Sequence, residues 1–97
     1  LAGRSPTVAE YLGRWLNASR ASVRPRTAAG YASIVAVRIV PRIGGVRLDR
    51  LTPDIIQTLY SDLADAGLSP RSVIRTHRCL HRALRQPVGW GLLGRNP

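Results

Sequence analysis

The sequence contains no lysine, few acidic residues and a single cysteine, and each shortage excludes something. The lone Cys79 excludes an internal disulfide. No apolar run approaches the roughly 20 residues that a membrane span needs, and no charged-then-apolar leader opens the chain. We therefore expect a cytoplasmic domain with no membrane partner.

The length of 97 residues is that of one domain, and a hydrophobic content of 44% is enough for a modest core. The chain starts with Leu1 rather than methionine, which indicates an excised fragment.

Positive charge is the unusual property of this sequence. Fifteen arginines stand against five acidic residues, which gives a net charge of +10. A GC-rich coding sequence can explain the choice of arginine over lysine, but it does not explain the excess charge. A polyanion is therefore the expected partner, with DNA or RNA first. An anionic membrane surface ranks second and is set aside, because the apolar face of the last helix is needed for the bundle.

The first predicted helix covers residues 8–18. Thr7 and Glu10 have the spacing of a capping box, which satisfies free N–H groups at a helix start. The residues that follow form one apolar stripe at helical spacing: Val8, Tyr11, Leu12, Trp15 and Leu16.

The second predicted helix covers residues 26–40. Tyr31, Val35 and Ile39 define its inner face, and Pro41 is expected to end it. The β-branched run in 34–40 leaves a strand open as an alternative.

Two further helices, at 53–66 and 70–86, begin with a cap residue followed by proline, namely Thr52-Pro53 and Ser69-Pro70. The inner face predicted for the last helix consists of Val73, His77, Leu80, Ala83 and Leu84.

Pro87 removes an N–H group and clashes with the Ala83 carbonyl, so we expect a kink or an end near Gln86, with Val88 and Trp90 folding back. The chain is therefore predicted to be all-α, a bundle of four helices at 8–18, 26–40, 53–66 and 70–86.

The charge is segregated along the chain. Residues 1–51 carry +7, residues 52–68 carry −3, and residues 69–97 carry +6. Within the last helix five arginines fall within about 40° of one line, on the side opposite the apolar face. These arginines are Arg71, Arg75, Arg78, Arg82 and Arg85.

This row of arginines has no acid at i±3 or i±4 to pair with, so like charges destabilise the helix slightly unless an anion binds. A merely solvated basic face is one interpretation, although such faces usually mix signs. The other is a helix that lies along a DNA groove, with arginines on phosphates and guanine edges. Positive charge near the second helix is added by Arg20, Arg24 and Arg26. The small residues on the outward side of this helix, including Gly30, would let the backbone of a partner approach closely.

Other sites are poorly supported by the sequence. His77 and His81 are four residues apart with Cys79 between them, but Cys79 points away from both and no third zinc ligand is evident. His77 is instead expected to be a half-buried core residue. We find no catalytic triad and no glycine-rich phosphate loop, and therefore expect no metal, no cofactor and no catalytic residue.

The order of motifs resembles the core-binding domain of phage integrases, the tyrosine site-specific recombinases. The resemblance covers residues 7–97. It rests on Thr7-Val8-Ala9-Glu10-Tyr11, Trp15-Leu16, Arg24-Pro25-Arg26-Thr27, Tyr31, Ile39-Val40-Pro41, Gly44, Leu48, Leu51-Thr52-Pro53-Asp54, Gly67-Leu68-Ser69-Pro70, Trp90-Gly91-Leu92 and Arg95-Asn96-Pro97.

The resemblance implies a SAM-like bundle at 7–97, after a flexible tail at 1–6, that forms half of a clamp around duplex recombination-site DNA. A catalytic domain after residue 97, absent here, forms the other half and carries the tyrosine nucleophile. Other integrase protomers on the DNA are further implied partners. The second and fourth helices of such domains face the major groove. Together with the arginine row, the DNA-contact candidates are Arg24, Arg26, Thr27, Gly30, Ser69, Arg71, Ser72, Arg75, Arg78 and Arg82.

The sequence leaves two other functions open. One is a helix-turn-helix-like transcriptional regulator, which would also bind DNA but would need no catalytic domain. The other is a protein-interaction bundle whose basic face meets an acidic partner.

Overall fold

The computed structural model describes the backbone of residues 5–89 and the side chains of residues 5–85. The described elements are helical: α1 (Val8–Ser19), α2 (Pro25–Ile34), a π-helical turn (Val35–Ile39), α3 (Val40–Ile43), a 3₁₀ turn (Leu48–Arg50), α4 (Pro53–Asp65) and α5 (Pro70–Gly89). The four predicted helices and the all-α class are confirmed, and the strand alternative for residues 34–40 is wrong. Extended pairing within the described range is limited to an isolated bridge between Thr7 and Arg47.

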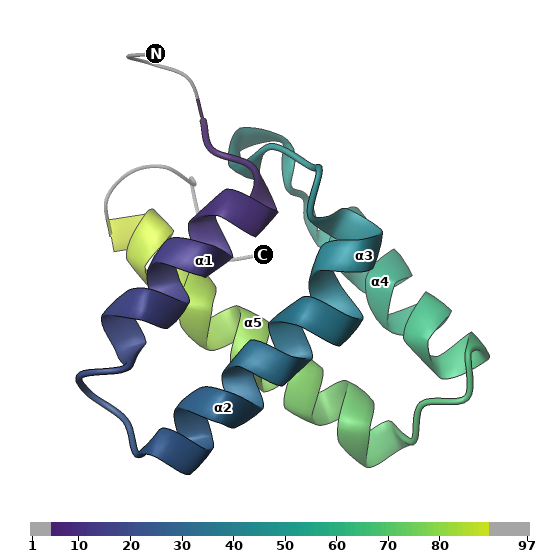
Figure 1. Ribbon diagram of the computed structural model, residues 1–97. Helices are drawn as coiled ribbons and strands as arrows, with labels where there is room; N and C mark the ends of the chain where they lie inside the picture. Colours follow the sequence, from purple (N-terminus) through teal and green to yellow (C-terminus); the bar gives the residue numbers. More distant parts are fainter. Residues whose placement is uncertain (1–4, 90–97) are drawn as a thin grey trace.

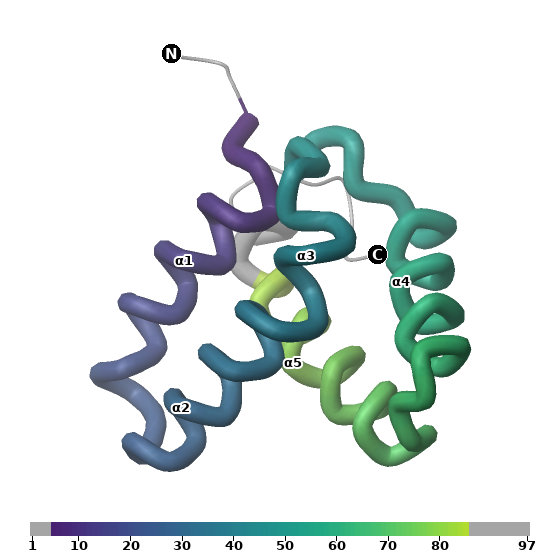
Figure 2. Tube along the Cα trace, turned by 45° about the vertical axis from the view of Figure 1, so that its right-hand side comes forward, coloured from purple at the N-terminus to yellow at the C-terminus, as the bar shows by residue number. Residues whose placement is uncertain are grey.

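The helices surround one core. Figure 1 shows α5 running diagonally behind α1 and α2, with α4 on the far side of α3, and α5 contacts both α2 and α4. The turned view in Figure 2 shows the same open arrangement, in which α1 and α2 lie on one side and α4 on the other. Helices α1, α4 and α5 each contribute several buried apolar side chains, whereas α2 contributes Ile34 and the short α3 contributes Ile43. Across all elements they are Val8, Tyr11, Leu12, Trp15, Ile34, Val35, Ile39, Ile43, Leu48, Leu51, Ile56, Leu59, Leu63, Cys79, Leu80, Ala83 and Leu84.

The start of α1 is fully capped, as its sequence predicts. Thr7 and Glu10 form the capping box in both directions, with the Glu10 amide donating to Thr7 Oγ1 (3.2 Å) and the Thr7 amide to the Glu10 carboxylate (2.9 Å). The next free donors reach the connector after α3: Val8 N–H donates to the Val46 carbonyl (2.8 Å) and Ala9 N–H to the Gly44 carbonyl (3.0 Å). The connector is thereby fastened to α1.

The predicted tail, residues 1–6, is joined to the same connector at its inner end. Leu48 N–H donates to the Pro6 carbonyl (2.8 Å), and Asp49 N–H donates to Ser5 Oγ (3.0 Å). Residues 1–4 lie outside the described range.

Pro41 does not end the second helix, and that prediction is wrong. The helical stretch continues to Ile43, three residues beyond the predicted end of 26–40. The reason is the π-helical turn, in which the Val40 N–H bonds to the Val35 carbonyl, five residues back rather than four. Pro41 then stands in the first turn of α3, where a missing N–H costs little.

Pro87 does not end the last helix either, because α5 continues past Gln86 to Gly89. A proline at 87 deprives the Ala83 carbonyl of its usual N–H partner four residues on. The Tyr11 hydroxyl of α1 donates a buried hydrogen bond to that same carbonyl. A side chain from another helix therefore replaces the missing backbone donor. The predicted fold-back of Val88 and Trp90 lies outside the described side chains.

Gly44 is required by a close approach. A Cβ at this position would lie 2.6 Å from the Val40 carbonyl oxygen and 2.9 Å from Val40 Cγ1, whereas a Cβ at Gly13 in α1 would meet nothing within 4 Å. We expect Gly44→Ala to lower the free energy of unfolding by about 1–2 kcal/mol. The matched change Gly13→Ala should raise it by about 0.5–1 kcal/mol, since alanine is the better helix former. Urea denaturation measures both, and a stabilising Gly44→Ala would contradict the geometry.

Candidate nucleic-acid interface

The arginine row of α5 lies on the molecular surface, as the sequence predicts. All five side chains are exposed, while the opposite side of the helix is buried. Among the described residues, the ion pair that forms is Arg47 with Asp49, so no acidic side chain there neutralises the row in an ion pair. The exposed members of the row are Arg71, Arg75, Arg78, Arg82 and Arg85.

The buried side of α5 differs from the prediction at three positions. His77 is exposed, and the inner face instead includes Thr76 and Cys79, which are 0% and 3% exposed. The prediction that His77 is a core residue is therefore wrong. Thr76 tolerates burial because its hydroxyl donates to the Ser72 carbonyl (2.9 Å), four residues back.

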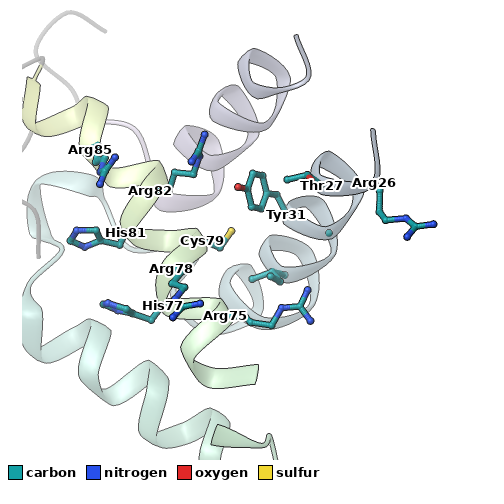
Figure 3. A pocket seen from close by; sticks show the side chains of 12 residues that line it. Arg26, Thr27, Tyr31, Arg75, His77, Arg78, Cys79, His81, Arg82 and Arg85 are labelled. Carbon is teal, nitrogen blue, oxygen red and sulfur yellow. The ribbon is translucent and has the colours of Figure 1, made fainter. Parts of the chain in front are cut away.

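An open depression of about 650 Å³ lies between α2 and α5. Within the described residues, none of those that line it is acidic. Residues of both helices form it: Arg26, Thr27, Gly30, Tyr31 and Ile34 from α2, and Arg75, His77, Arg78, Cys79, His81, Arg82 and Arg85 from α5. Figure 3 shows these side chains, with Cys79 on the side of α5 nearer α2 and both histidines on the other side. We call the exposed surface formed by these residues the α2–α5 face.

The inner part of the depression is uncharged. Tyr31 packs on Trp15 with ring centroids 5.1 Å apart, and Ile34 is buried beneath it. Burial raises the pKa of the Cys79 thiol to about 11, so this group stays protonated and neutral at physiological pH. The positive charge is therefore carried by the rim and the exposed part of α5.

Arg38 connects the two helices that form this face. Its Nη1 donates to the Ser72 carbonyl and to Thr76 Oγ1, both at 3.3 Å, from the π-helical turn onto the first turns of α5. Arg38 is half-buried. It thus fixes how α2 and α5 cross, and nothing in its sequence context indicated this role.

Six of the ten predicted contact residues line the depression together, namely Arg26, Thr27, Gly30, Arg75, Arg78 and Arg82. The other four lie at the helix starts. Arg24 is the exposed N-cap residue of α2, and Arg71 is exposed in the first turn of α5. Ser69 Oγ accepts from the Ser72 amide (3.2 Å), which caps α5, and it donates to Ser72 Oγ (3.1 Å).

His77 and His81 belong to this surface although the sequence did not assign them to it. Both are exposed and line the depression, and their ring centroids are 5.6 Å apart. His77 Nδ1 lies 3.0 Å from the Tyr60 hydroxyl of α4. Their i, i+4 spacing beside the arginine row was the available signal. Arg85, part of the row but not among the contact candidates, also lines the depression.

The described part of the chain contains neither a cluster of metal ligands nor a membrane-spanning helix. No group of three or more His, Cys, Asp or Glu side chains there could hold a metal ion. None of the helices in the same range combines the length and the hydrophobicity of a membrane span.

Comparison with known proteins points to one family. The family described as "Phage integrase, N-terminal SAM-like domain" matches residues 7–64. An integrase from Saccharopolyspora erythraea is 29% identical over 98 residues, which cover 98% of this chain. The chain spans 22% of the length of that integrase.

Two solution NMR structures have the same fold. The integrase-like domain from Bacillus cereus has a TM-score of 0.89 and 26% identity, over 99% of this chain and 81% of that one. The phage integrase SAM-like domain from Moorella thermoacetica has a TM-score of 0.81 and 34% identity, over 100% of this chain and 84% of that one. This likeness agrees with the SAM-like bundle predicted from the sequence.

Proposed function

The chain belongs to the phage integrase N-terminal SAM-like domain family, and on that premise we propose that it is the core-binding domain of a tyrosine-recombinase-type integrase. It holds duplex recombination-site DNA against the α2–α5 face. The observation that carries the proposal is the depression between α2 and α5, rimmed by arginines and lined by no acidic residue among those described. A surface of this kind attracts a polyanion, because it presents no acidic side chain that would repel the phosphates.

Arginines of the face supply most of the binding energy by neutralising phosphates. Arg75, Arg78 and Arg82 stand along one line of α5, so they can follow one DNA strand. On α2, Thr27 has a short side chain and Gly30 has none, so the duplex can approach this helix closely. Sequence preference then comes from a few arginine contacts to base edges in the major groove.

This domain is the N-terminal SAM-like domain of integrases and not their catalytic domain. We propose that strand exchange is the task of a catalytic domain of the same polypeptide, assembled with other protomers on the DNA. The tyrosines of this chain form contacts within the domain. Tyr11 is buried and bonded to the Ala83 carbonyl, Tyr31 packs on Trp15, and Tyr60 is bonded to His77. Family membership favours this function over the helix-turn-helix-like regulator that the sequence left open.

The expected salt dependence tests the proposal. With roughly five to eight phosphate contacts, the logarithm of the association constant should fall against the logarithm of salt concentration with a slope of about −4 to −7. Fluorescence anisotropy with a labelled mixed-sequence duplex over a salt series measures this slope. The isolated domain should bind weakly, because a linked second domain would raise the effective concentration. A flat salt dependence would contradict the proposal.

A further inference from the structure

His77 of the α2–α5 face is hydrogen-bonded to Tyr60 of α4, the helix that carries acidic residues and no arginine. The Tyr60 hydroxyl of α4 lies 3.0 Å from its Nδ1, and the two rings meet edge to face with centroids 5.5 Å apart. On its other side the His81 ring lies 5.6 Å away. The imidazole is therefore held in one place while remaining exposed beside Arg75 and Arg78.

Acting as a donor, the Tyr60 hydroxyl determines which nitrogen of His77 carries the proton. Burial, with a smaller contribution from Cys79, raises the pKa of Tyr60 to about 12, so its O–H is retained and available as a donor. A neutral imidazole has one donor nitrogen and one acceptor nitrogen. When Tyr60 donates to Nδ1, the proton of His77 must be on Nε2, across the ring from the bond.

We propose that His77 is a further DNA-binding residue of the α2–α5 face, whose Nε2–H donates to a phosphate oxygen, and that Tyr60 is the positioning residue that orients it. The inference rests on the proposed function, since it needs a duplex on this face. It gives α4, which carries no arginine, a defined part in the interface.

The role differs in kind from that of the arginines. An arginine contact releases a counterion and is weakened by salt, whereas a neutral imidazole N–H adds a directional hydrogen bond and changes the salt dependence little. A bond of this kind fixes where a phosphate sits relative to α5. His77 would therefore set the register of the domain on the duplex, while the arginine row supplies attraction.

The first experiment compares His77→Ala with Arg75→Ala in the domain at pH 8. His77→Ala should lower the affinity for a mixed-sequence duplex about three- to tenfold with an unchanged salt slope. Arg75→Ala should lower the affinity and also reduce the magnitude of the slope by about 1. Ile74→Ala, which removes an exposed α5 side chain without a hydrogen-bonding group, is the control and should bind like wild type.

The second experiment tests Tyr60 through a double-mutant cycle. Tyr60→Phe should weaken binding about two- to fivefold in the wild-type background and not at all in the His77→Ala background. Nitrogen-15 NMR of the imidazole should find the His77 proton on Nε2 in the free wild-type domain. Far-UV circular dichroism verifies that each variant is folded.

Distinct results overturn each claim. If Arg75→Ala weakens binding and His77→Ala does not, the DNA-binding role of His77 is wrong and the proposed function stands. If Tyr60→Phe still weakens binding in the His77→Ala background, or if the proton is on Nδ1, the positioning role is wrong. If wild type binds no duplex even at low salt, both the function and this inference are wrong.

Discussion

Replacing Arg75 and Arg82 together by glutamate should lower the affinity of the domain for duplex DNA by more than about a hundredfold. Both side chains are exposed on α5 and line the depression on the α2–α5 face. An arginine contact to a nucleic acid is worth roughly 1–3 kcal/mol, so losing two amounts to about thirtyfold or more. Glutamate adds repulsion from the phosphates to that loss.

The matched control is Arg47→Glu with Arg50→Glu, which makes the same change in net charge on the connector before α4. Both arginines are exposed, and the ion pair of Arg47 with Asp49 is a surface pair of little worth to stability. This pair of changes should weaken binding less than about tenfold, because it lowers only the long-range electrostatic attraction of the whole domain for DNA. Equal losses for the two pairs would show that bulk charge, and not the α2–α5 face, binds DNA.

Tyr11→Phe should lower the free energy of unfolding by about 1–3 kcal/mol, a large effect for the removal of one oxygen atom. The Tyr11 hydroxyl donates to the Ala83 carbonyl, which lacks its usual N–H partner four residues on because residue 87 is proline. Tyr11 is 3% exposed and Ala83 is 0% exposed, so water cannot readily replace the lost donor. A buried acceptor left without a partner carries its full desolvation cost.

The control for this prediction is Tyr31→Phe, since Tyr31 is half-buried and its hydroxyl forms no hydrogen bond among the described residues. Its cost should be within about 0.5 kcal/mol. Pro87→Ala provides a second check, because an alanine N–H can serve the Ala83 carbonyl and should reduce the cost of Tyr11→Phe. Urea denaturation measures the free energy of unfolding of Tyr11→Phe, Tyr31→Phe, Pro87→Ala and the double variant of Tyr11→Phe with Pro87→Ala. Equal costs for the two tyrosines would contradict the assigned hydrogen bond.

The elements that local chemistry determines were predictable from the sequence. The capping box at Thr7 and the cap-proline starts at Thr52 and Ser69 depend only on residues within one turn. All three marked helix starts are confirmed. The arginine row was predictable for the same reason, because helical periodicity alone places its members on one line.

Features that depend on contacts between distant segments were not predictable. The sequence predicts a helix end at Pro41 and a kink or an end near Pro87, yet the helix continues past both. A π-helical turn accommodates Pro41, and Tyr11, which is 72 residues from Ala83 along the chain, supplies a donor near Pro87. His77 occupies a position that helical spacing assigns to the buried side of α5. In the structure the buried side includes Thr76 instead.

The candidate site was predicted in part for the same reasons. Spacing could indicate which side of α5 is basic, but not that α2 would lie beside it. The depression, the Arg38 bridge to α5 and the bond between Tyr60 and His77 each join residues at least 17 positions apart. Such contacts follow from how the helices cross, which no local pattern in this sequence encodes.

The most direct test of the central claim is a titration of the nitrogen-15-labelled domain with a mixed-sequence DNA duplex, followed by amide chemical shifts. The largest shifts should occur in α2 and in residues 70–85 of α5. The exposed acidic side of α4, marked by Asp54, Asp62 and Asp65, should change little. Shifts concentrated on α4 or on the connector, with α2 and α5 unaffected, would contradict the central claim.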